Sequence, residues 1–461
     1  MSEHPNPSAP GTVDLTSIVK AYDVRGTVPE QMNGAVAHAL GVAFARFAGA
    51  STVLVGRDMR PSGEELVDEF SRGVMEQGAD VVDLGLASTD LVYYAAGRLD
   101  APGAVFTASH NPAQYNGVKF CLSGARPVGQ DTGLDQLREV AQDVLDGRGP
   151  LAAATVGSRS TRNLLSAFAD HVVSFVDTAA LRPMRVVADT ANGMGGLVVP
   201  AVFDRIPQLT LEVMYGELDG TFPNHPADPL QPANQRDLQA RVVAGGFDLG
   251  LAFDGDADRV FVVDETGRGL SGSTTTAMLA ANILRRHPGA TILHNLICSR
   301  AVPEVIREHG GVPVRTKVGH SFIKQVMADT GAVFGGEHSA HYYFLDNYRA
   351  DSGLIASMFV LDELSRSESA LSIVRKPYER YSSSGEINTH VDDPLAVIER
   401  VADAYAHAAL DRLDGLTVDV GRWWFNLRPS NTGAAAAAQL EAPDRNECDQ
   451  RAVDVLALIT G

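Results

Sequence analysis

Short apolar runs alternate with amphipathic segments over most of this 461-residue chain. The run at 51–58, STVLVGRD, is rich in β-branched residues and precedes a helical pattern at 62–78 and a second apolar run at 79–85. The same order recurs within 184–216 and 248–296. Strands that alternate with helices are typical of βαβ units, in which helices cover parallel or mixed sheets. The pattern predicts an α/β protein with three related α/β domains in tandem, each built on a mixed sheet.

The pattern changes after Lys376. Residues 378–391 and 417–433 read as separate strands, and the segment 394–410 between them has a helical pattern. We expect a smaller α+β domain at the C-terminal end of the chain. The predicted domains are 12–155, 156–254, 255–372 and 373–461.

Composition and charge narrow the classes of partner. The chain is 45% hydrophobic and 21% charged, as globular proteins usually are, and its net charge is −19. No Lys/Arg-rich run offsets that charge, so we expect neither nucleic acid nor an anionic membrane as a partner. No stretch approaches the roughly twenty apolar residues that a membrane span requires. A bound anion must therefore be held by a few basic side chains gathered in one place.

The cysteines and the first residues bear on the compartment. Cys121, Cys298 and Cys448 are far apart and odd in number, which predicts packing residues rather than disulfides. The polar, proline-rich residues 1–12 lack the basic and apolar parts of a signal peptide. We expect a cytoplasmic protein, because free thiols persist in reducing compartments.

Three aspartates follow the apolar run LGLAF in the motif DGDADR. Asp254, Asp256 and Asp258 stand at alternate positions, and Gly255 allows the loop to turn tightly. Ligation by oxygen alone favours a hard cation, Mg²⁺ or Ca²⁺. Arg259 would then contact an anion that bridges to the metal. The alternative is an acidic hairpin turn, since Asp-Gly is common in such turns.

The segment TASHNPAQYNGVKF, 107–120, collects groups suited to phosphoryl transfer. Taken singly, Ser109 could cap a turn, His110 could be structural and Lys119 could be a surface lysine. Together with Asn111 and a metal loop elsewhere, they favour transfer of a phosphoryl group through the serine oxygen. A phosphoserine would carry close to two negative charges, which the metal and nearby basic side chains could neutralise.

Further motifs contain groups that could bind a sugar phosphate. In GGEHSAHYYF the side chains of Glu337, Ser339 and His341 would project to one side of an extended loop toward sugar hydroxyls; a polar edge strand is the alternative. A second motif, RPSNTG, combines a guanidinium with hydrogen-bonding side chains that could bind a phosphate; these residues are Arg428, Ser430, Asn431 and Thr432. The motif AYDVRG adds a weaker signal from Tyr22 and Arg25.

The motifs TASHNP, DGDADR, GEHSAH and RPSNTG, in this order, resemble those of the α-D-phosphohexomutases, most closely the bacterial phosphomannomutase/phosphoglucomutase group. The resemblance extends over nearly the whole chain, from AYDVRG to RPSNTG. It implies four domains around a central cleft. It also implies a phosphomannomutase-like intramolecular phosphotransferase, an isomerase that interconverts hexose 1-phosphate and hexose 6-phosphate through a phosphoserine and a hexose 1,6-bisphosphate.

The resemblance also implies roles for individual residues. One Mg²⁺ per chain would be bound by Ser109, Asp254, Asp256 and Asp258. The catalytic group would comprise Ser109, His110, Lys119, Arg259, His320 and Arg25, with the general base unassigned between candidates. The substrate, a small hexose phosphate, would contact Tyr22, Glu337, Ser339, His341, Arg428, Ser430, Asn431 and Thr432.

The chain departs from the family pattern in two places. Ala340 stands where family members usually carry glycine. The run Ala434–Ala438 replaces a bulky apolar strand after RPSNTG, and alanine is a poor strand former. We therefore expect a weakly supported strand behind the phosphate-binding motif.

Three other functions compete. An aspartyl-phosphate sugar phosphatase would use Asp254 as nucleophile, but Asp258 stands where such loops usually carry Thr or Val. A non-catalytic sugar-phosphate or Ca²⁺-binding module would leave the TASHNP cluster without a function. Phosphoglucosamine mutases share several motifs, although HSAH and RPSN favour the mannose/glucose group. Mannose and glucose phosphates differ only at C2, so the preference between them stays open.

Overall fold

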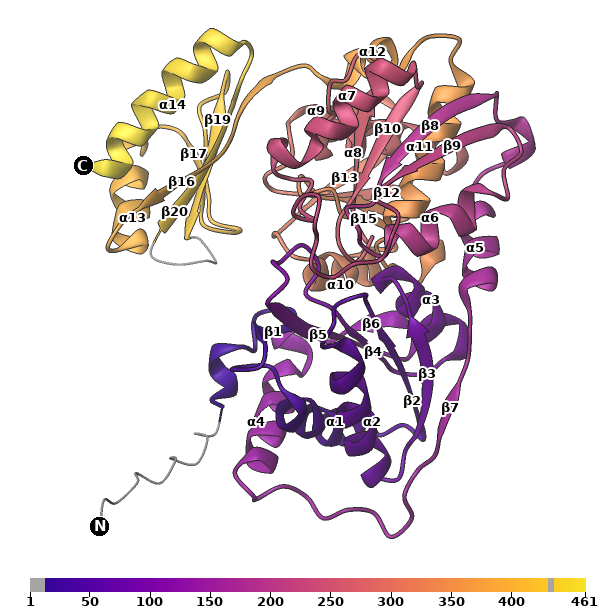
Figure 1. Ribbon diagram of the computed structural model, residues 1–461. Coiled ribbons are helices and arrows are strands. Elements are labelled where there is room, and N and C mark those ends of the chain that lie inside the picture. Colours follow the sequence, from indigo (N-terminus) through magenta and orange to yellow (C-terminus); the bar gives the residue numbers. More distant parts are fainter. Residues whose placement is uncertain (1–12, 430–434) are drawn as a thin grey trace, which may run out of the picture.

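A computed structural model describes residues 13–429 and 435–461 of the chain (Figure 1). The expected N-terminal tail, residues 1–12, and three residues of the predicted phosphate clamp, Ser430, Asn431 and Thr432, lie outside the described residues. No helix in the described part of the chain combines the length and the apolar character that a membrane span needs.

The first sheet is sandwiched between helices. Its strands have the order β1-β5-β4-β2-β3-β7, and β6 pairs with β5. Helices α1, α2 and α4 pack with Val53 and Val55 on one face, while α3 packs with Leu54 on the other. This is the alternation that a strand buried on both faces requires. The elements are β1 (Val24–Thr27), α1 (Gly34–Ala48), β2 (Thr52–Arg57), α2 (Gly63–Glu76), β3 (Asp80–Leu86), α3 (Thr89–Leu99), β4 (Gly103–Phe106), β5 (Tyr115–Leu122), β6 (Arg126–Pro127), α4 (Leu134–Leu145) and β7 (Arg159–Thr161).

The second and third sheets have four strands each. Their orders are β11-β10-β8-β9 and β13-β12-β14-β15. The second domain comprises α5 (Leu165–Val173), β8 (Met184–Asp189), α6 (Gly195–Phe203), β9 (Leu209–Met214), α7 (Arg236–Gly245), β10 (Leu249–Phe253) and β11 (Val260–Asp264). The third domain comprises α8 (Gly272–Arg286), β12 (Thr291–Asn295), α9 (Ala301–Glu308), β13 (Val312–Thr316), α10 (His320–Thr330), β14 (Phe334–Gly336), β15 (Tyr342–Phe344), α11 (Gly353–Arg366) and α12 (Leu371–Val374).

One topology recurs in these three sheets. Three parallel strands are followed by an antiparallel one, in the orders β3-β2-β4-β5, β9-β8-β10-β11 and β13-β12-β14-β15. The prediction of three related α/β domains with mixed sheets is confirmed. In each domain the loop that follows the third parallel strand holds a predicted motif: 107–114 after β4, 254–259 after β10 and 337–341 after β14. The repeat thus sets equivalent loops at the carboxyl ends of equivalent strands, where such sheets bind ligands.

The fourth domain is an antiparallel sheet covered by two helices. Its order is β16-β20-β19-β18-β17, and its apolar cluster is separate from the cluster that links the first three domains. In Figure 1 it stands beside the third domain at the upper left. Its elements are β16 (Ser382–His390), α13 (Pro394–Ala404), β17 (Ala409–Asp411), β18 (Leu416–Asp419), β19 (Trp424–Pro429), β20 (Ala435–Ala442) and α14 (Arg445–Thr460).

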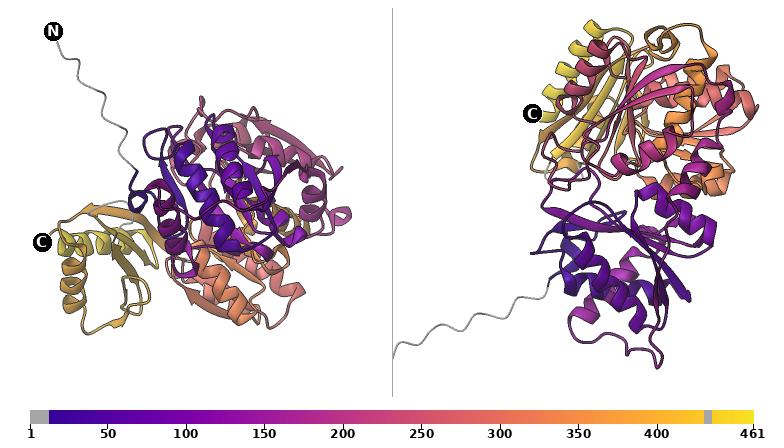
Figure 2. Two further views of the ribbon diagram at one scale, coloured as in Figure 1. Left: turned by 90° about the horizontal axis from the view of Figure 1, so that it is seen from below. Right: turned by 45° about the vertical axis from the view of Figure 1, so that its right-hand side comes forward.

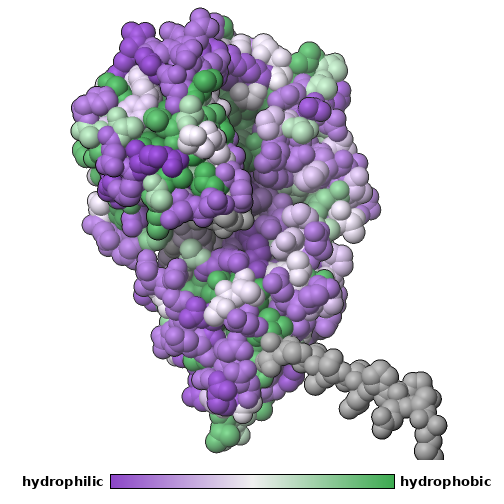
Figure 3. Space-filling model, turned by 90° about the vertical axis from the view of Figure 1, so that its left-hand side faces the viewer, coloured by the Kyte–Doolittle hydropathy of each residue, from purple (hydrophilic) through white to green (hydrophobic). Residues whose placement is uncertain are grey.

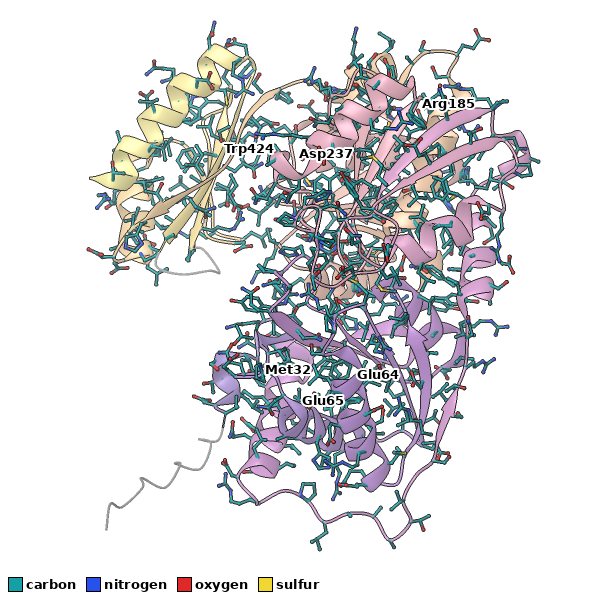
Figure 4. The ribbon with its side chains drawn as sticks, viewed as in Figure 1. Met32, Glu64, Glu65, Arg185, Asp237 and Trp424 are labelled. Carbon is teal, nitrogen blue, oxygen red and sulfur yellow. The ribbon has the colours of Figure 1, made fainter. Side chains whose placement is uncertain are left out.

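Contacts through β20 and β19 dock the fourth domain on the third. Gln439 donates to the Ile297 carbonyl at 2.8 Å, and the Glu441 carboxylate accepts from the Arg300 backbone N–H at 2.9 Å. Trp424, on the side of the sheet turned toward the third domain (Figure 4), donates to the same carboxylate at 2.8 Å. Two further views of this arrangement are given in Figure 2.

The alanine run does form a strand, although alanine is a poor strand former. β20 is a central strand, paired on one side with β16 and on the other with β19. Backbone hydrogen bonds on both sides and burial decide its conformation, because strand propensity depends strongly on context. The bulky neighbours Phe425 and Leu427, opposite Leu440 and Ala438, supply the volume that the alanines lack.

The prediction that the cysteines are packing residues is confirmed. Cys121, Cys298 and Cys448 are all free and buried. They act as small apolar packing residues, as predicted.

The close contact between helices α1 and α2 leads to a prediction about stability. A Cβ atom on Gly73 would lie 2.3 Å from the His38 carbonyl oxygen, so this helix pair packs backbone to backbone. We expect Gly73→Ala to lower the free energy of unfolding by about 1–3 kcal/mol through overpacking. The matched control is Gly63→Ala in the same helix, where the nearest atom, 3.3 Å away, belongs to the flexible Arg57 side chain. Urea unfolding of both variants measures the effect, and equal stabilities would contradict it.

Candidate active site

The serine loop of the first domain touches the aspartate loop of the second. The Ser109 hydroxyl donates to Asp254 Oδ2 at 2.9 Å, across 145 residues of sequence, and both side chains are buried. A Cβ on Gly255 would lie 2.4 Å from the Ser109 carbonyl oxygen, so only glycine permits this approach. The two motifs singled out in the sequence therefore form one site.

Ser109 holds an unusual backbone conformation. Its φ is +48°, in the left-handed region that an L-residue adopts at a cost of about 1–2 kcal/mol. Strain of this kind persists only where surrounding contacts enforce it, and it gathers at functional sites.

Lys119 bridges two of the three aspartates. Its Nζ lies 2.8 Å from Asp256 Oδ2 and 2.7 Å from Asp258 Oδ2, and the Thr89 hydroxyl donates to the former at 2.6 Å. Within the described residues, the Oδ1 atoms of Asp256 and Asp258 are buried without a hydrogen-bond partner. A cation would satisfy such atoms, and the ligand oxygens of Asp254, Asp256 and Asp258 lie within 4.8 Å of one another. The acidic cluster can hold a metal ion, and its oxygen-only donors suit a hard one.

Burial and neighbouring charges set the protonation of this cluster. Burial raises the pKa of Asp254 to about 7, against the opposing effect of Arg259. Burial also acts to raise the pKa of Asp256, but Lys119 outweighs it and holds that pKa well below its usual value. The imidazole of His110 is neutral, because burial and the Arg259 charge lower its pKa to about 2. Its Nδ1 accepts from Arg259 at 2.6 Å and lies 3.3 Å from Ser109 Oγ.

Arg25 and Tyr22 belong to the first domain and contact different loops of the site. Arg25 donates to the Asn111 side chain at 2.6 Å, which ties it to the serine loop. The Tyr22 hydroxyl donates to the Val318 carbonyl of the third domain at 3.1 Å, and burial raises its pKa to about 12. Both predicted residues thus lie where the first domain faces the others.

The predicted sugar-binding loop, 337–341, differs from the expected extended form. The Glu337 N–H donates to the His341 carbonyl at 3.0 Å and the Ala340 N–H to the Glu337 carbonyl at 3.1 Å, so the loop is a tight turn between β14 and β15. The expectation of an extended segment was wrong, because the hairpin closes within five residues. Ala340 has φ +66°, the conformation for which glycine is favoured at this position.

The side chains of the turn have different partners. Glu337 is buried and accepts from Asn295 at 3.1 Å and from the Tyr343 hydroxyl at 2.5 Å. His341 Nδ1 lies 2.8 Å from Asp351 Oδ2 and 3.9 Å from Asp258 Oδ1, which connects this loop to the aspartate cluster. Ser339 is half-buried on the turn.

The fourth domain supplies Arg428. Its guanidinium is 15% exposed and pairs with Glu386 at 2.5 Å, and its charge opposes the rise in the Tyr22 pKa across the domain boundary. His320 begins α10, and its side chain, like Ser430, Asn431 and Thr432, lies outside the described residues. Figure 3 shows the side of the molecule that lies at the left in Figure 1. Its surface is mostly hydrophilic and is hollowed near its middle.

Sequence reasoning missed several supporting residues. Thr89 and Asn295 contact predicted site residues from elements remote in the sequence, and Tyr343 and Asp351 contact Glu337 and His341 from within ten residues of them. Arg60, which contacts the serine loop, lies three residues after the end of β2. Its place at the carboxyl end of a strand was the available signal.

Comparisons with known proteins agree with this arrangement. The models of phosphoglucomutase/phosphomannomutase α/β/α domains I, II and III match residues 16–144, 166–268 and 271–381. A protein of Xanthomonas campestris pv. campestris named "Phosphohexose mutases" is 40% identical over 90% of this chain and 92% of its own. The phosphomannomutase of Escherichia coli K12 is 36% identical over 92% and 94%, respectively.

Solved structures agree as well. A phosphoglucomutase/phosphomannomutase family protein of Burkholderia thailandensis superimposes with a TM-score of 0.87 at 30% identity, covering 96% of this chain and 97% of its own. Aspergillus fumigatus N-acetylphosphoglucosamine mutase, solved with GlcNAc-6P and magnesium, has a TM-score of 0.63 at 13% identity over 98% and 97%, a likeness of fold alone.

Three repeated α/β/α domains whose equivalent loops surround a buried serine and acidic cluster define the class of intramolecular phosphotransferases, which are isomerases. The chain belongs to the phosphoglucomutase/phosphomannomutase family.

The contact between Gly255 and Ser109 yields a prediction. Adding one methyl group in Gly255→Ala must push the two loops apart, because the new Cβ would lie 2.4 Å from a backbone oxygen. Misplacement of reacting groups by about 1 Å costs on the order of 100-fold in rate, so we expect that loss in kcat. Steady-state kinetics of the folded variant measures it. Wild-type kcat would show that the close approach is dispensable.

Proposed function

We propose that this protein interconverts hexose 1-phosphates and hexose 6-phosphates, with the transferred phosphoryl group carried on Ser109. The observation that carries the proposal is the buried Ser109 hydroxyl, 2.9 Å from Asp254, within an acidic cluster that also contains Lys119 and Arg259. Negative charge from a phosphoserine is tolerable there only because these basic groups and a cation balance it.

Mg²⁺ fits this site. Three carboxylates offer oxygen ligands alone, and two of their buried oxygens lack other partners within the described residues. One Mg²⁺ would be bound by Asp254, Asp256, Asp258 and the phosphorylated Ser109. Its chemistry would be to polarise the phosphoryl oxygens and neutralise their charge.

The protein's own residues divide the remaining work. Arg259 and Lys119 balance charge on the transferring group, and the neutral His110 imidazole orients Arg259 by accepting its hydrogen bond. A substrate hydroxyl attacks phosphorus, the bond from phosphorus to Ser109 Oγ breaks, and the proton lost by the sugar hydroxyl ends on that serine oxygen. The product of this half-reaction is a hexose 1,6-bisphosphate. Arg25 and His320 are the candidates for the proton transfer.

The second half-reaction requires the bisphosphate to turn round. Its other phosphate must then reach Ser109, while the first occupies the site vacated by the second. Arg428, together with Ser430, Asn431 and Thr432, would hold the non-reacting phosphate, and Tyr22, Glu337, Ser339 and His341 would contact the sugar. The fourth domain has its own apolar core, which suits it to move as a unit when substrate enters or leaves.

The geometry argues against an aspartyl-phosphate phosphatase. Asp254 is fully buried, and both of its carboxylate oxygens accept hydrogen bonds, Oδ1 from the Arg259 backbone and Oδ2 from Ser109 and the Arg259 side chain. A nucleophilic carboxylate needs a free oxygen facing the substrate. The serine hydroxyl is the better placed nucleophile.

Substitution of the nucleophile is the direct functional test. We expect Ser109→Ala to abolish conversion of glucose 1-phosphate to glucose 6-phosphate, because the variant lacks the atom that carries the phosphoryl group. Calorimetry should find Mg²⁺ binding largely retained, since the three aspartates remain. Ser123→Ala, which alters a serine in the same domain bonded to Asp100, is the matched control and should keep full activity. Near-normal turnover by Ser109→Ala would refute the role of the serine.

Substrate preference forms a separate prediction. We expect mannose 1-phosphate and glucose 1-phosphate to have kcat/KM values within about tenfold of each other, because a small stereochemical change is worth only about 1–3 kcal/mol in a binding site. Relatives named phosphomannomutase at 36–37% identity support this sugar group. Turnover of glucosamine 1-phosphate should be lower. A dominant preference for glucosamine 1-phosphate would reassign the protein to the phosphoglucosamine mutases.

A further inference from the structure

Arg60 is a buried arginine that no predicted role includes. It follows β2 in the motif GRDMRPSG and is 1% exposed. A buried guanidinium is expensive unless all its N–H groups are satisfied and its charge is balanced. The partners of Arg60 therefore indicate what holds it there.

Those partners are the backbone carbonyls of the serine loop. Arg60 Nη2 donates to the carbonyls of Ser109 at 2.9 Å and Asn111 at 2.6 Å, and Nη1 donates to those of Pro112 at 2.9 Å and Tyr115 at 2.8 Å. All four lie within residues 109–115, which are the serine loop and the first residue of β5. The guanidinium is thus the centre around which the loop wraps.

The remaining donor fixes the guanidinium itself. Arg60 Nε donates to Asp58 Oδ2 at 3.2 Å, and the Asp58 Oδ1 atom accepts from the Arg60 backbone N–H at 2.9 Å. With this bond all five guanidinium N–H groups are used. Asp58 is fully buried and supplies the compensating charge. The pair is therefore rigid, and its orientation is set by a strand end rather than by the loop that it holds.

The second domain closes over the same group. The Phe222 ring lies 5.1 Å from the guanidinium carbon, and a Cβ on Gly220 would lie 2.6 Å from Arg60 Cα. This segment leads to Ala227, whose Cβ would lie 3.5 Å from a Cβ on Gly255 of the aspartate loop. Arg60 is thus packed between the loop that carries the nucleophile and the domain that carries the aspartates.

We propose that Arg60 is a positioning residue that holds Ser109 in its left-handed conformation, with the hydroxyl directed at Asp254. The Ser109 φ of +48° is unfavourable by itself, and the bond from Nη2 to the Ser109 carbonyl fixes the orientation of the peptide on its C-terminal side. Loss of that bond would let the loop relax to an ordinary conformation and turn the hydroxyl away from the aspartates. The inference rests on the proposed function, in which Ser109 is the nucleophile.

Lysine cannot replace this arginine. Its ammonium has three donors on a flexible stem, whereas the guanidinium has five in a fixed plane that can serve four carbonyls and a carboxylate together. Arg60→Lys keeps the charge and most of the volume, so it isolates the loss of this geometry. Arg60→Ala leaves a space that a free guanidinium ion from solvent can occupy.

The test compares Arg60→Lys, Arg60→Ala and wild-type enzyme in the conversion of glucose 1-phosphate to glucose 6-phosphate. We expect kcat to fall about 100-fold in both variants, as for a misplaced nucleophile. KM should change much less, because the groups that contact the sugar lie on other loops. Low, non-denaturing concentrations of guanidinium chloride should raise the kcat of Arg60→Ala about tenfold. They should leave the kcat of Arg60→Lys unchanged, because its side chain fills the space.

Gly73→Ala is the control for stability, since it weakens the same domain without touching the serine loop. Its kcat should equal that of wild type, and guanidinium should not raise it. A kcat for Arg60→Lys equal to wild type would overturn the proposal. The proposal would also be overturned if Gly73→Ala lost as much kcat as the Arg60 variants and guanidinium did not restore the kcat of Arg60→Ala. Absence of activity in the wild-type enzyme would instead refute the proposed function.

Discussion

Compensation of buried charge is the constraint on which this structure depends. Asp254, Asp256 and Asp258 are at most 1% exposed, and burying three neighbouring carboxylates without partners would be prohibitively costly. Arg259 comes from the same loop, but Lys119 comes from the first domain, 137 residues away from Asp256. The aspartate loop is therefore electrostatically complete only when the first two domains are docked. Formation of the domain interface and formation of the site are one event.

The repeated topology explains how a long chain brings these groups together. Each of the first three domains adds an antiparallel strand after three parallel ones, and the loop before that strand points to the common centre. One repeat carries Ser109, the next the three aspartates and the third Glu337 and His341. The fourth domain has a different sheet and a separate apolar core, and it docks on the third through Gln439 and Glu441. Three domains that share one apolar cluster, with a fourth that has its own, suit the proposed reaction, whose intermediate must turn round.

Sequence reasoning reached the fold class and the main site because both rest on local signals. Apolar periodicity marks strands and helices, and unusual polar clusters directly after strands mark loops that meet at one sheet edge. Contacts made across the chain leave no such mark. The pairing of Lys119 with the aspartates, and of Thr89 with Asp256, appears only in three dimensions. Propensity alone could not predict that the alanine run forms a strand, because pairing on both sides and bulky neighbours on β19 outweigh it. The Glu337 loop was predicted to be extended because the alternate spacing of its polar residues is compatible with both an extended segment and a tight hairpin.

The central claim is that Ser109 is phosphorylated within a charge-balanced nest shared with the aspartates. Mass spectrometry of the full-length protein, digested with trypsin after incubation with Mg²⁺ and glucose 1,6-bisphosphate, tests it most directly. The account predicts one phosphate on the peptide 99–119, located at Ser109, and none when Asp256 is replaced by alanine. Phosphate on the peptide 242–259, which contains the three aspartates, or on neither peptide, would contradict it.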